Sequence, residues 1–324
     1  MRIFTGRTIL AALTGVFLCY GPAPASAQTI LDRDLIEVLA GIQRVLQQAD
    51  NAHEDRQNLD GSIRWEYIEK EDKNLLEISF RGFRYYIVKE EAADSRVITL
   101  SGAMNLDFDE EHISGSLTVQ GLPSVSSLVL TEYNPKTGLV TVNGSPYDNG
   151  VMEGLFDEAY ELIDDNALVD MEIEAGIVFV TMFIAVTEIN LEKKLNEADF
   201  DGVNIPGGIE GSNEKGTVNF STRKGVVDIS YAAYTRTDIP FYGSFPVLDG
   251  KISMEFRIDQ GDADFVAVFD GSLAVKNMLL VSSMRLDACM MEDIGEKNAS
   301  GSIVIDGESY QFSDFAGTLK RLSF

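Results

Sequence analysis

The sequence predicts an α+β, mostly β protein with two tandem copies of an antiparallel β-meander sheet, each preceded by an amphipathic or buried helix. Three observations lead to this prediction: segments of alternating apolar and polar residues, stretches with helical spacing of apolar residues, and an internal duplication. We divide the chain into a signal peptide at residues 1–27 and two repeat units, at residues 28–150 and 151–324.

The N-terminal segment has the pattern of a cleavable secretory signal peptide. Arg2 and Arg7 supply positive charge, residues 9–20 are apolar, and Ala25-Ser26-Ala27 is a small-x-small cleavage pattern. The apolar run is shorter than a bilayer span. We therefore expect an exported, periplasmic or secreted protein with no transmembrane helix in the mature chain.

Several segments alternate apolar and polar residues with a period of two, as strands with one buried and one wet face do. Turn-forming residues between them suit a meander of about six strands per unit. Asn134-Pro-Lys-Thr-Gly138 predicts a hairpin in which Gly138 adopts positive φ. The alternation changes phase across Arg81-Gly82, which predicts a β-bulge.

Helical spacing appears ahead of each sheet. In the first unit Leu31, Leu35, Leu39, Ile42 and Leu46 recur at intervals of four and three. In the second unit residues 168–189 fit a helix, although Ile177-Val-Phe-Val180 also resembles a strand; the duplication favours the helix. A further amphipathic helix is predicted between the sheets from Met152, Leu155, Phe156, Ala159 and Ile163.

The duplication is clearest where residues 115–128, GSLTVQGLPSVSSL, align without a gap to residues 271–284, GSLAVKNMLLVSSM. Other matches follow in the same order: 61–65 with 216–220, 76–80 with 227–231, 102–108 with 250–256, and 138–147 with 301–310. We therefore expect Gly115 to be equivalent to Gly271, Ser126-Ser127 to Ser282-Ser283, and Tyr147 to Tyr310.

The charge of the chain excludes some partners. The sequence has 26 basic and 52 acidic residues, a formal net charge of −26. Such a charge repels nucleic acids and anionic lipids, so we expect no nucleic-acid partner. Cys289 is the one cysteine outside the signal peptide, so the mature chain cannot form an intramolecular disulfide. The hydrophobic core must therefore stabilise the fold.

No pattern for catalysis, metal or cofactor binding stands out, and we predict no catalytic residue, no metal site and no cofactor. The chain lacks a Gly-x-Ser-x-Gly turn, and its histidines are His53 and His112. Cys289 has no basic neighbour in sequence and is expected to be a buried small hydrophobe. Residues 197–202 resemble a calcium loop, but Gly208 stands where the closing Glu is needed, which favours an acidic linker.

Two further sets of residues have ordinary interpretations. Acidic pairs such as Asp107/Asp109 and Asp262/Asp264 are expected from composition alone, although a glycosidase also needs two carboxylates. The aromatic residues of the early strands are expected to pack in the core, with an apolar ligand pocket as the alternative. They are Trp65, Tyr67, Phe80, Phe83, Tyr85, Tyr86, Tyr231, Tyr234, Phe241 and Tyr242. Asn143, Asn219 and Asn298 lie in Asn-x-Ser sequons.

These observations favour an exported, non-catalytic binding protein. Its ligand is expected to be an apolar small molecule or an envelope protein, and the sequence does not identify the residues that bind it. A structural or surface-interaction protein of the cell envelope is the first alternative. An outer-membrane barrel is the second: Phe324 and the alternating strands suit it, but Thr318 and Lys320 stand where the last strand should be apolar. An enzyme ranks last.

Overall fold

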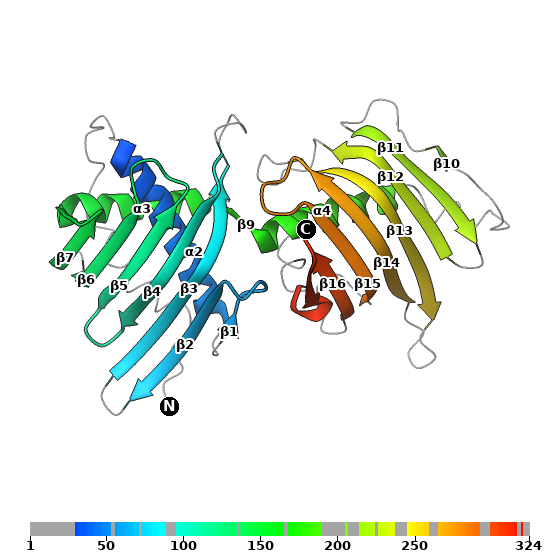
Figure 1. Cartoon of the computed structure of the whole chain (residues 1–324). Coiled ribbons are helices and arrows are strands. Elements are labelled where there is room, and N and C mark those ends of the chain that lie inside the picture. The colour runs from blue at the N-terminus through cyan, green and yellow to red at the C-terminus, as the bar shows by residue number, and fades with distance from the viewer. Residues whose placement is uncertain are drawn as a thin grey trace. The chain divides into compact units, whose positions relative to one another are not determined.

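The computed structural model describes residues 30–52, 56–70, 73–88, 95–134, 136–164, 168–188, 205–206, 214–223, 226–236, 245–258, 265–291, 299–315 and 319. The predicted signal peptide lies outside these residues. The chain forms two compact units, Met1–Val169 and Asp170–Phe324. Each unit contains one antiparallel sheet and at least one helix (Figure 1), as predicted.

The first sheet is a meander in which each strand pairs with the next along the chain, and β9 also pairs with β3. Its outermost meander strands contain two and three residues. The strands are β1 Arg56–Gln57, β2 Ile63–Lys70, β3 Lys73–Ile87, β4 Ile98–Asp107, β5 His112–Gln120, β6 Ser127–Asn134, β7 Thr137–Val142, β8 Ser145–Tyr147 and β9 Leu168–Asp170.

The second sheet is also a meander, with eight strands in sequence order. Both units therefore have two more meander strands than the six expected, because the edge strands of two to four residues are too short to show alternation. Its strands are β10 Ile205–Pro206, β11 Glu214–Arg223, β12 Val226–Arg236, β13 Val247–Ile258, β14 Phe265–Lys276, β15 Ser283–Met291, β16 Ser300–Ile305 and β17 Glu308–Gln311.

The strand positions confirm the duplication. Gly115 lies in the fifth strand of the first meander and Gly271 in the fifth of the second; Ser127 and Ser283 each begin the sixth. Backbone conformation repeats as well: apart from Glu111 and Gly271, the residues with positive φ fall in equivalent pairs. These pairs are Gly61/Gly216, Gly82/Ala233, Gly102/Gly250, Gly121/Asn277, Glu132/Ala288, Gly138/Gly301, Asn143/Asp306 and Gly144/Gly307.

The predicted bulge is present in β3, where the register with β4 shifts between Arg81 and Phe83. The intervening Gly82 has φ 77°. In the predicted hairpin, Asn134 pairs with Thr137 and Gly138 has φ 91°, while Pro135 lies outside the described residues. Both local predictions are confirmed.

The predicted helices also form: α2 Ile30–Ala52, α3 Asn149–Asp164 and α4 Met171–Glu188. Helix α3 packs against α2 and lies in the first compact unit. The boundary between units therefore falls after Val169 rather than at residue 150, because the apolar stripe of α3 is buried against the first core. Within the described residues, no helix is long and apolar enough to span a membrane.

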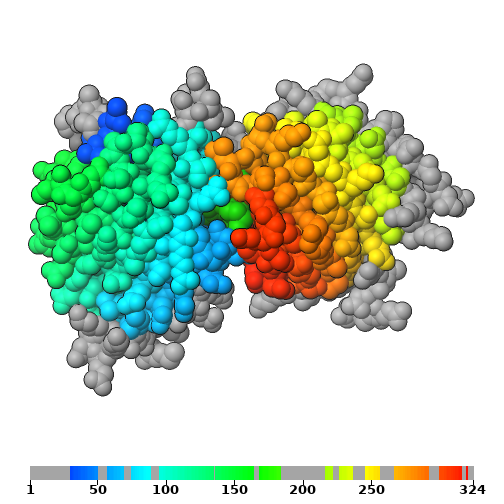
Figure 2. Space-filling model, viewed as in Figure 1, coloured from blue at the N-terminus to red at the C-terminus, as the bar shows by residue number. Residues whose placement is uncertain are grey.

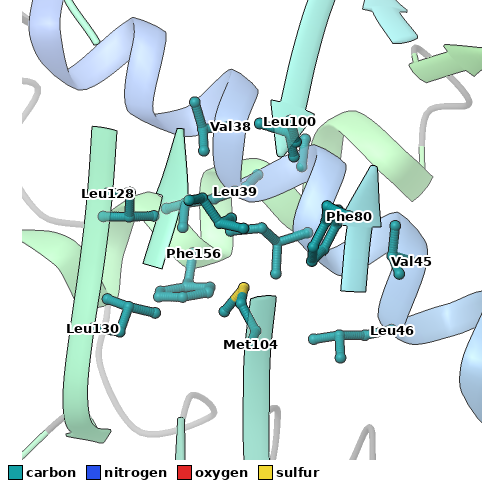
Figure 3. Packing of buried hydrophobic residues seen from close by; sticks show 14 of the residues in the cluster. Val38, Leu39, Val45, Leu46, Phe80, Leu100, Met104, Leu128, Leu130 and Phe156 are labelled. Atoms are coloured by element: carbon teal, nitrogen blue, oxygen red, sulfur yellow. The ribbon is translucent and has the colours of Figure 1, made fainter. Parts of the chain in front are cut away.

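The first core lies between one face of the sheet and the helices (Figure 3). Val38, Leu39, Val45 and Leu46 of α2 meet strand residues such as Phe80, Leu100, Met104, Leu128 and Leu130. Alternate residues of each strand point into this core, so the opposite face of the sheet carries the polar set.

In the second unit, α4 takes the place of α2. Phe179 packs against Phe269 of β14 and against Phe312 and Phe315, with ring centroids 6.1, 5.7 and 6.3 Å away. The Tyr231 hydroxyl donates a hydrogen bond to the carbonyl of Met182, 2.9 Å away. Helix-on-sheet packing is thus repeated in both units.

A buried carboxylate ties each helix to the loop after the fifth strand. Asp34 of α2 accepts hydrogen bonds from the Ser124 amide (2.9 Å) and hydroxyl (2.6 Å). Glu174 of α4 accepts bonds from the amides of Leu279, Leu280 and Val281, at 2.8, 2.6 and 2.6 Å. Ser124 and Leu280 are equivalent in the duplication, so both copies have the same carboxylate clamp.

A tyrosine pair gives a first test of the packing. The buried Tyr85 hydroxyl donates to the Glu37 carbonyl (2.8 Å), and its ring lies where a Cβ on Gly41 would be. Tyr85→Phe should lower the free energy of unfolding by about 1 kcal/mol because it leaves a buried carbonyl with one partner fewer.

Tyr133→Phe is the matched control. Its hydroxyl is buried without a hydrogen-bond partner among the described residues, so its removal should be neutral or stabilising. Urea unfolding of both variants measures the difference; equal losses would contradict the hydrogen-bond assignment.

Candidate interaction surface

The outer face of the first sheet is the face opposite the helices. In Figure 1, α2 and α3 pass behind the strands, and Figure 2 shows the side chains of this face in the same view. Over β4–β7 its outward residues are mostly small or amide-bearing; Leu139 is half-exposed on β7, and Glu132, at the β6 bulge beside Ser114, is the one exposed charged side chain of these strands. The uncharged outward residues other than Leu139 form a platform. This neutral platform consists of Ser101, Ala103, Asn105, Ser114, Ser116, Thr118, Gln120, Ser127, Val129, Thr131 and Thr141.

Strand register places these side chains in rows across the sheet. In the central row, Ser79 pairs with Ala103, Ala103 with Ser116, Ser116 with Val129, and Val129 with Thr141. No side chain in this row is longer than valine. The row therefore forms a low, even surface that another surface can approach closely.

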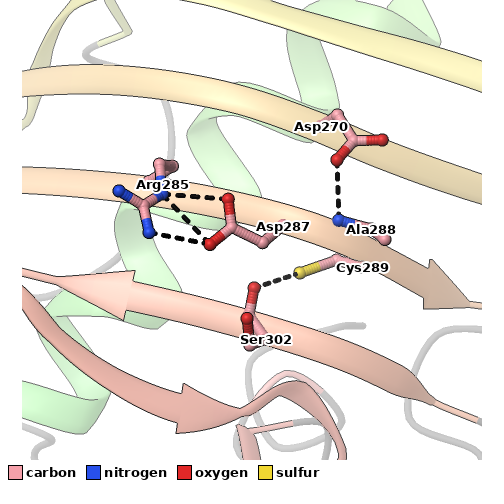
Figure 4. Close-up of polar contacts among 6 residues, drawn as sticks. All are labelled: Asp270, Arg285, Asp287, Ala288, Cys289 and Ser302. Carbon is pink, nitrogen blue, oxygen red and sulfur yellow. Dashed lines mark hydrogen bonds and ion pairs between the residues drawn. The ribbon is translucent and has the colours of Figure 1, made fainter.

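The second sheet provides an internal comparison, because its outer face has the same positions. There the equivalents of platform residues include Asp249, Lys251, Asp270, Lys276, Arg285 and Asp287. Some of these charges pair: Lys276 with Asp249 at 2.9 Å and Arg285 with Asp287 at 2.8 Å (Figure 4). This pattern is typical of a solvated face, whereas the same positions of the first sheet are uncharged, and Glu132 is the exposed charge next to them.

Three arginines border the neutral platform on β2 and β3. Arg64, Arg81 and Arg84 are exposed on the outer face. No hydrogen bond or ion pair joins their guanidinium groups to the described residues. Arg81 and Arg84 lie beside the platform, since Arg81 pairs with Ser101 and Arg84 with Thr99. We call these three residues the arginine end.

Two glutamates occupy the next row of the same strands. Glu66 and Glu77 are directly paired across β2 and β3, and both are exposed. Like charges placed opposite each other destabilise a strand pair. We call these two residues the glutamate end; beyond it the strand pair continues through Ile68–Leu75 to Lys70–Lys73.

Cys289 does not support a catalytic role. It is buried in β15, and burial raises the pKa of its thiol to about 12. Its sulfur donates to the carbonyl of Ser302, 3.1 Å away (Figure 4). A protonated, buried thiol is a poor nucleophile, so the predicted role as a small core residue is the better description.

The other residues with a chemical interpretation are not assembled into a site. His112 begins β5, and Asp107 accepts hydrogen bonds from the amides of Asp109 and Glu110, as in a turn. No group of metal-ligating side chains is found among the described residues. His53, residues 197–204 and 207–208, and Asp262/Asp264 lie outside the described residues.

The aromatic residues of the early strands are mostly buried, as core packing requires. Trp65, Phe80, Phe83, Tyr85, Tyr86, Tyr231 and Tyr234 are buried, and Tyr67 is partly buried. Phe241 and Tyr242 lie outside the described residues. Trp65, Phe80, Phe83 and Tyr85 belong to the core beneath α2 and α3, whereas Tyr86 is buried outside that cluster.

Of the sequon residues, Asn143 has a structural role. Its side chain accepts hydrogen bonds from Ser126 and donates one to the Ser124 carbonyl at 2.7 Å. Asp306 accepts the equivalent bond from the Ser282 amide at 2.9 Å. Asn219 is exposed on β11, and Asn298 lies outside the described residues.

Comparison with protein-family models, with curated proteins and with solved structures gives no match. The evidence for the interaction surface is therefore the comparison between the two repeat units of this chain. Sequence reasoning did not identify it, although the alternation in Ser101/Ala103/Asn105 and Ser114/Ser116/Thr118 shows uncharged outward positions on neighbouring strands. The missing information was which strands are adjacent and in what register.

Helix α3 has an acidic outward side that allows a test of surface electrostatics. Burial raises the pKa of Asp157 above its usual value, and the charges of Glu153 and Glu161, one turn away on each side, add to this. The stabilising contribution of protonated Asp157 is present at low pH and is lost as pH rises through its raised folded-state pKa.

Asp157→Asn should therefore raise stability by about 0.5 kcal/mol at pH 7, because it removes two like-charge contacts on a helix. The gain should shrink as the pH falls through the pKa of Asp157. Urea unfolding of wild type and variant at pH 7 and pH 3.5 measures it; a gain that is larger at the lower pH would contradict the assignment.

Proposed function

We propose that this protein is an exported, non-catalytic binding protein and that the outer face of its first sheet contacts a partner protein. The observation that carries the proposal is the contrast between the two copies. One outer face has six charged residues at the equivalent positions, and the other, in a chain of net charge −26, exposes Glu132 as the one charged side chain over β4–β7.

The physical reason for this contrast is desolvation. A charged side chain in the centre of an interface loses its water, so the centres of protein interfaces contain few charges. A face that only meets water has no such constraint. Arginine is also enriched at interfaces, which suits the position of Arg81 and Arg84 beside the platform.

The size of the face suits a protein partner. From standard strand and residue spacings, β2–β7 over four rows cover about 25 Å by 25 Å, on the order of 600 Å². A standard interface buries about 800 Å² on each partner. An apolar small molecule is less well supported, because the described aromatic residues of the early strands are already buried or partly buried within the protein.

A site-specific photo-crosslinker tests the proposal. It is placed at Ser116, in the centre of the platform, or at the equivalent Ser272 in the second sheet, and the protein is expressed in its native host. We expect a discrete protein adduct from position 116 and none from position 272. The adduct should disappear when Arg81→Glu and Arg84→Glu are added.

Adducts of equal yield from both positions, or none from position 116, would overturn the proposal. Secretion and thermal unfolding of each variant serve as the folding control. Because Ser116 and Ser272 are both exposed positions on equivalent strands, a difference between them reports the surface and not the crosslinker.

A further inference from the structure

We infer that the partner that contacts the outer face of the first sheet presents an acidic protein segment to the arginine end. The segment is extended, with carboxylates on alternate residues. This inference rests on the proposed function and identifies the chemistry of the partner at one border of the same surface. It follows from the spacing and the surroundings of three guanidinium groups.

The bulge in β3 brings two of these arginines to one face of the sheet. Arg81 and Arg84 are three residues apart, so in a regular strand their side chains would point to opposite faces. Gly82 is the extra residue of the bulge, and both arginines are exposed on the outer face. They pair with Ser101 and Thr99, two residues apart on β4, so they occupy successive rows about 7 Å apart.

Arg64 extends this series by one row. It pairs with Ser79, which lies two residues before Arg81 on β3. The arginine end therefore spans about 14 Å along the strands. Among the described residues, no hydrogen bond or ion pair engages these three guanidinium groups.

The second sheet lacks the arginine series. The equivalent positions in the duplication are Asn219, Ala232 and Thr235, none of which is charged. The bulge is nevertheless kept there, with a register shift between Tyr231 and Tyr234. Formation of the bulged sheet therefore does not require the arginines.

The arginine end is positive in its immediate surroundings. The nearest outward acid on β3 is Glu77, and strand geometry places it about 14 Å from Arg81 and about 20 Å from Arg84. At physiological ionic strength, exposed charges are screened beyond about 8 Å. On the other side, Arg81 and Arg84 adjoin the uncharged platform. A carboxylate in contact with these two arginines is therefore attracted, despite the net charge of −26.

The spacing of the rows favours a protein segment. Alternate residues of an extended chain are also about 7 Å apart, so a segment with an acid at every second position places one carboxylate opposite each arginine. Arginine binds carboxylates through paired hydrogen bonds. One row further, Glu66 and Glu77 would repel a fourth acid. The matching order is therefore three acids followed by a base, which fixes the register of the segment along the strands.

Two synthetic peptides test this inference. The probe, Lys-Thr-Glu-Thr-Glu-Thr-Glu, has the matching order; the control, Glu-Thr-Lys-Thr-Glu-Thr-Glu, has the same composition with the lysine inside the series. Each is titrated into the isotopically labelled mature protein. The probe should shift the amide resonances of Ser79 and Ser101 with a dissociation constant of about 0.1–1 mM, about fivefold tighter than the control. Raising the salt from about 0.15 to 0.5 M should weaken binding.

Variants locate the contact. Arg81→Glu/Arg84→Glu should weaken binding of the probe about tenfold or more. Arg285→Glu is the matched control, because Arg285 is also exposed on an outer face but is already paired with Asp287 at 2.8 Å. It should leave binding of the probe unchanged. The amide spectrum of each variant shows whether it is folded.

The outcomes separate this inference from the proposed function. Selective binding of the probe that is lost in Arg81→Glu/Arg84→Glu supports the inference. Equal affinity for both peptides, binding that survives the double variant, or no binding at about 5 mM probe overturns it. Binding of polygalacturonate in place of the probe also overturns it, because the ligand is then an anionic polysaccharide. An adduct from position 116 and none from position 272 would still support the proposed function. Selective binding of the probe without an adduct from position 116 overturns the proposed function and leaves the carboxylate contact.

Discussion

Replacing Glu174 by alanine should cost about 3–5 kcal/mol of unfolding free energy. Its carboxylate is fully buried and accepts three backbone amides, from Leu279, Leu280 and Val281. Hydrogen bonds to a charged group contribute about 1.5–3 kcal/mol each, and their loss leaves buried donors unpaired. The three contributions are not additive, which keeps the expected total below their sum.

Asp34→Ala is the matched variant in the first unit. Asp34 accepts one amide and one hydroxyl from Ser124, so its loss should cost less, about 1–3 kcal/mol. Global unfolding in urea measures the total effect. Hydrogen exchange at the amides of Leu280 and Val281 supplies a local readout and should accelerate in Glu174→Ala but not in Asp34→Ala.

If Glu174→Ala changes the unfolding free energy only slightly and leaves exchange at the Leu280 and Val281 amides unchanged, the proposed role of Glu174 in holding this loop is wrong. Glu174→Gln refines the test, because glutamine keeps one acceptor oxygen but places an amino group against an amide donor. We expect it to fall between wild type and alanine. A glutamine variant less stable than alanine would show that placing an amino group against the amide donors costs more than removing the side chain.

Replacing Gly102 by alanine should cost about 3 kcal/mol or more. Gly102 has φ 138°, a conformation that side-chain-bearing residues rarely adopt. A Cβ there would also overlap the carbonyl oxygen of Ser116 on the neighbouring strand, and backbone cannot move aside cheaply. The adjacent β4 and β5 would have to separate or shift register.

Gly144→Ala is the control that isolates the clash. Gly144 has φ 78°, and a Cβ there would meet no atom within 4 Å, so it incurs the conformational cost alone, about 1 kcal/mol. The duplication supplies an independent replicate: Gly250→Ala should behave like Gly102→Ala, and Gly307→Ala like Gly144→Ala. Thermal and urea unfolding measure all of them. If Gly102→Ala and Gly144→Ala lose the same stability, or Gly250→Ala and Gly307→Ala do, the close approach of the strands at Gly102 and Gly250 is contradicted.

Much of the fold could be predicted because it depends on local patterns. The spacing of Leu35, Leu39 and Ile42 gave α2, and the phase change at Arg81-Gly82 gave the bulge. For residues 177–180, alternation and helical spacing both fit, and the helix was favoured through its position in the duplication. Edge strands of two to four residues carry too little pattern to be recognised.

The sequence by itself determined the two tandem sheets and the pairing of equivalent residues, because periodicity and repetition are properties of the chain. Only the tertiary structure decided which side chains share a surface. Ser101, Ser116 and Val129 are ordinary outward residues in sequence, and they become neighbours on one face when β4, β5 and β6 pair in register. The same holds for Glu174 and Leu280, more than a hundred residues apart, whose contact depends on how a helix lies across a sheet.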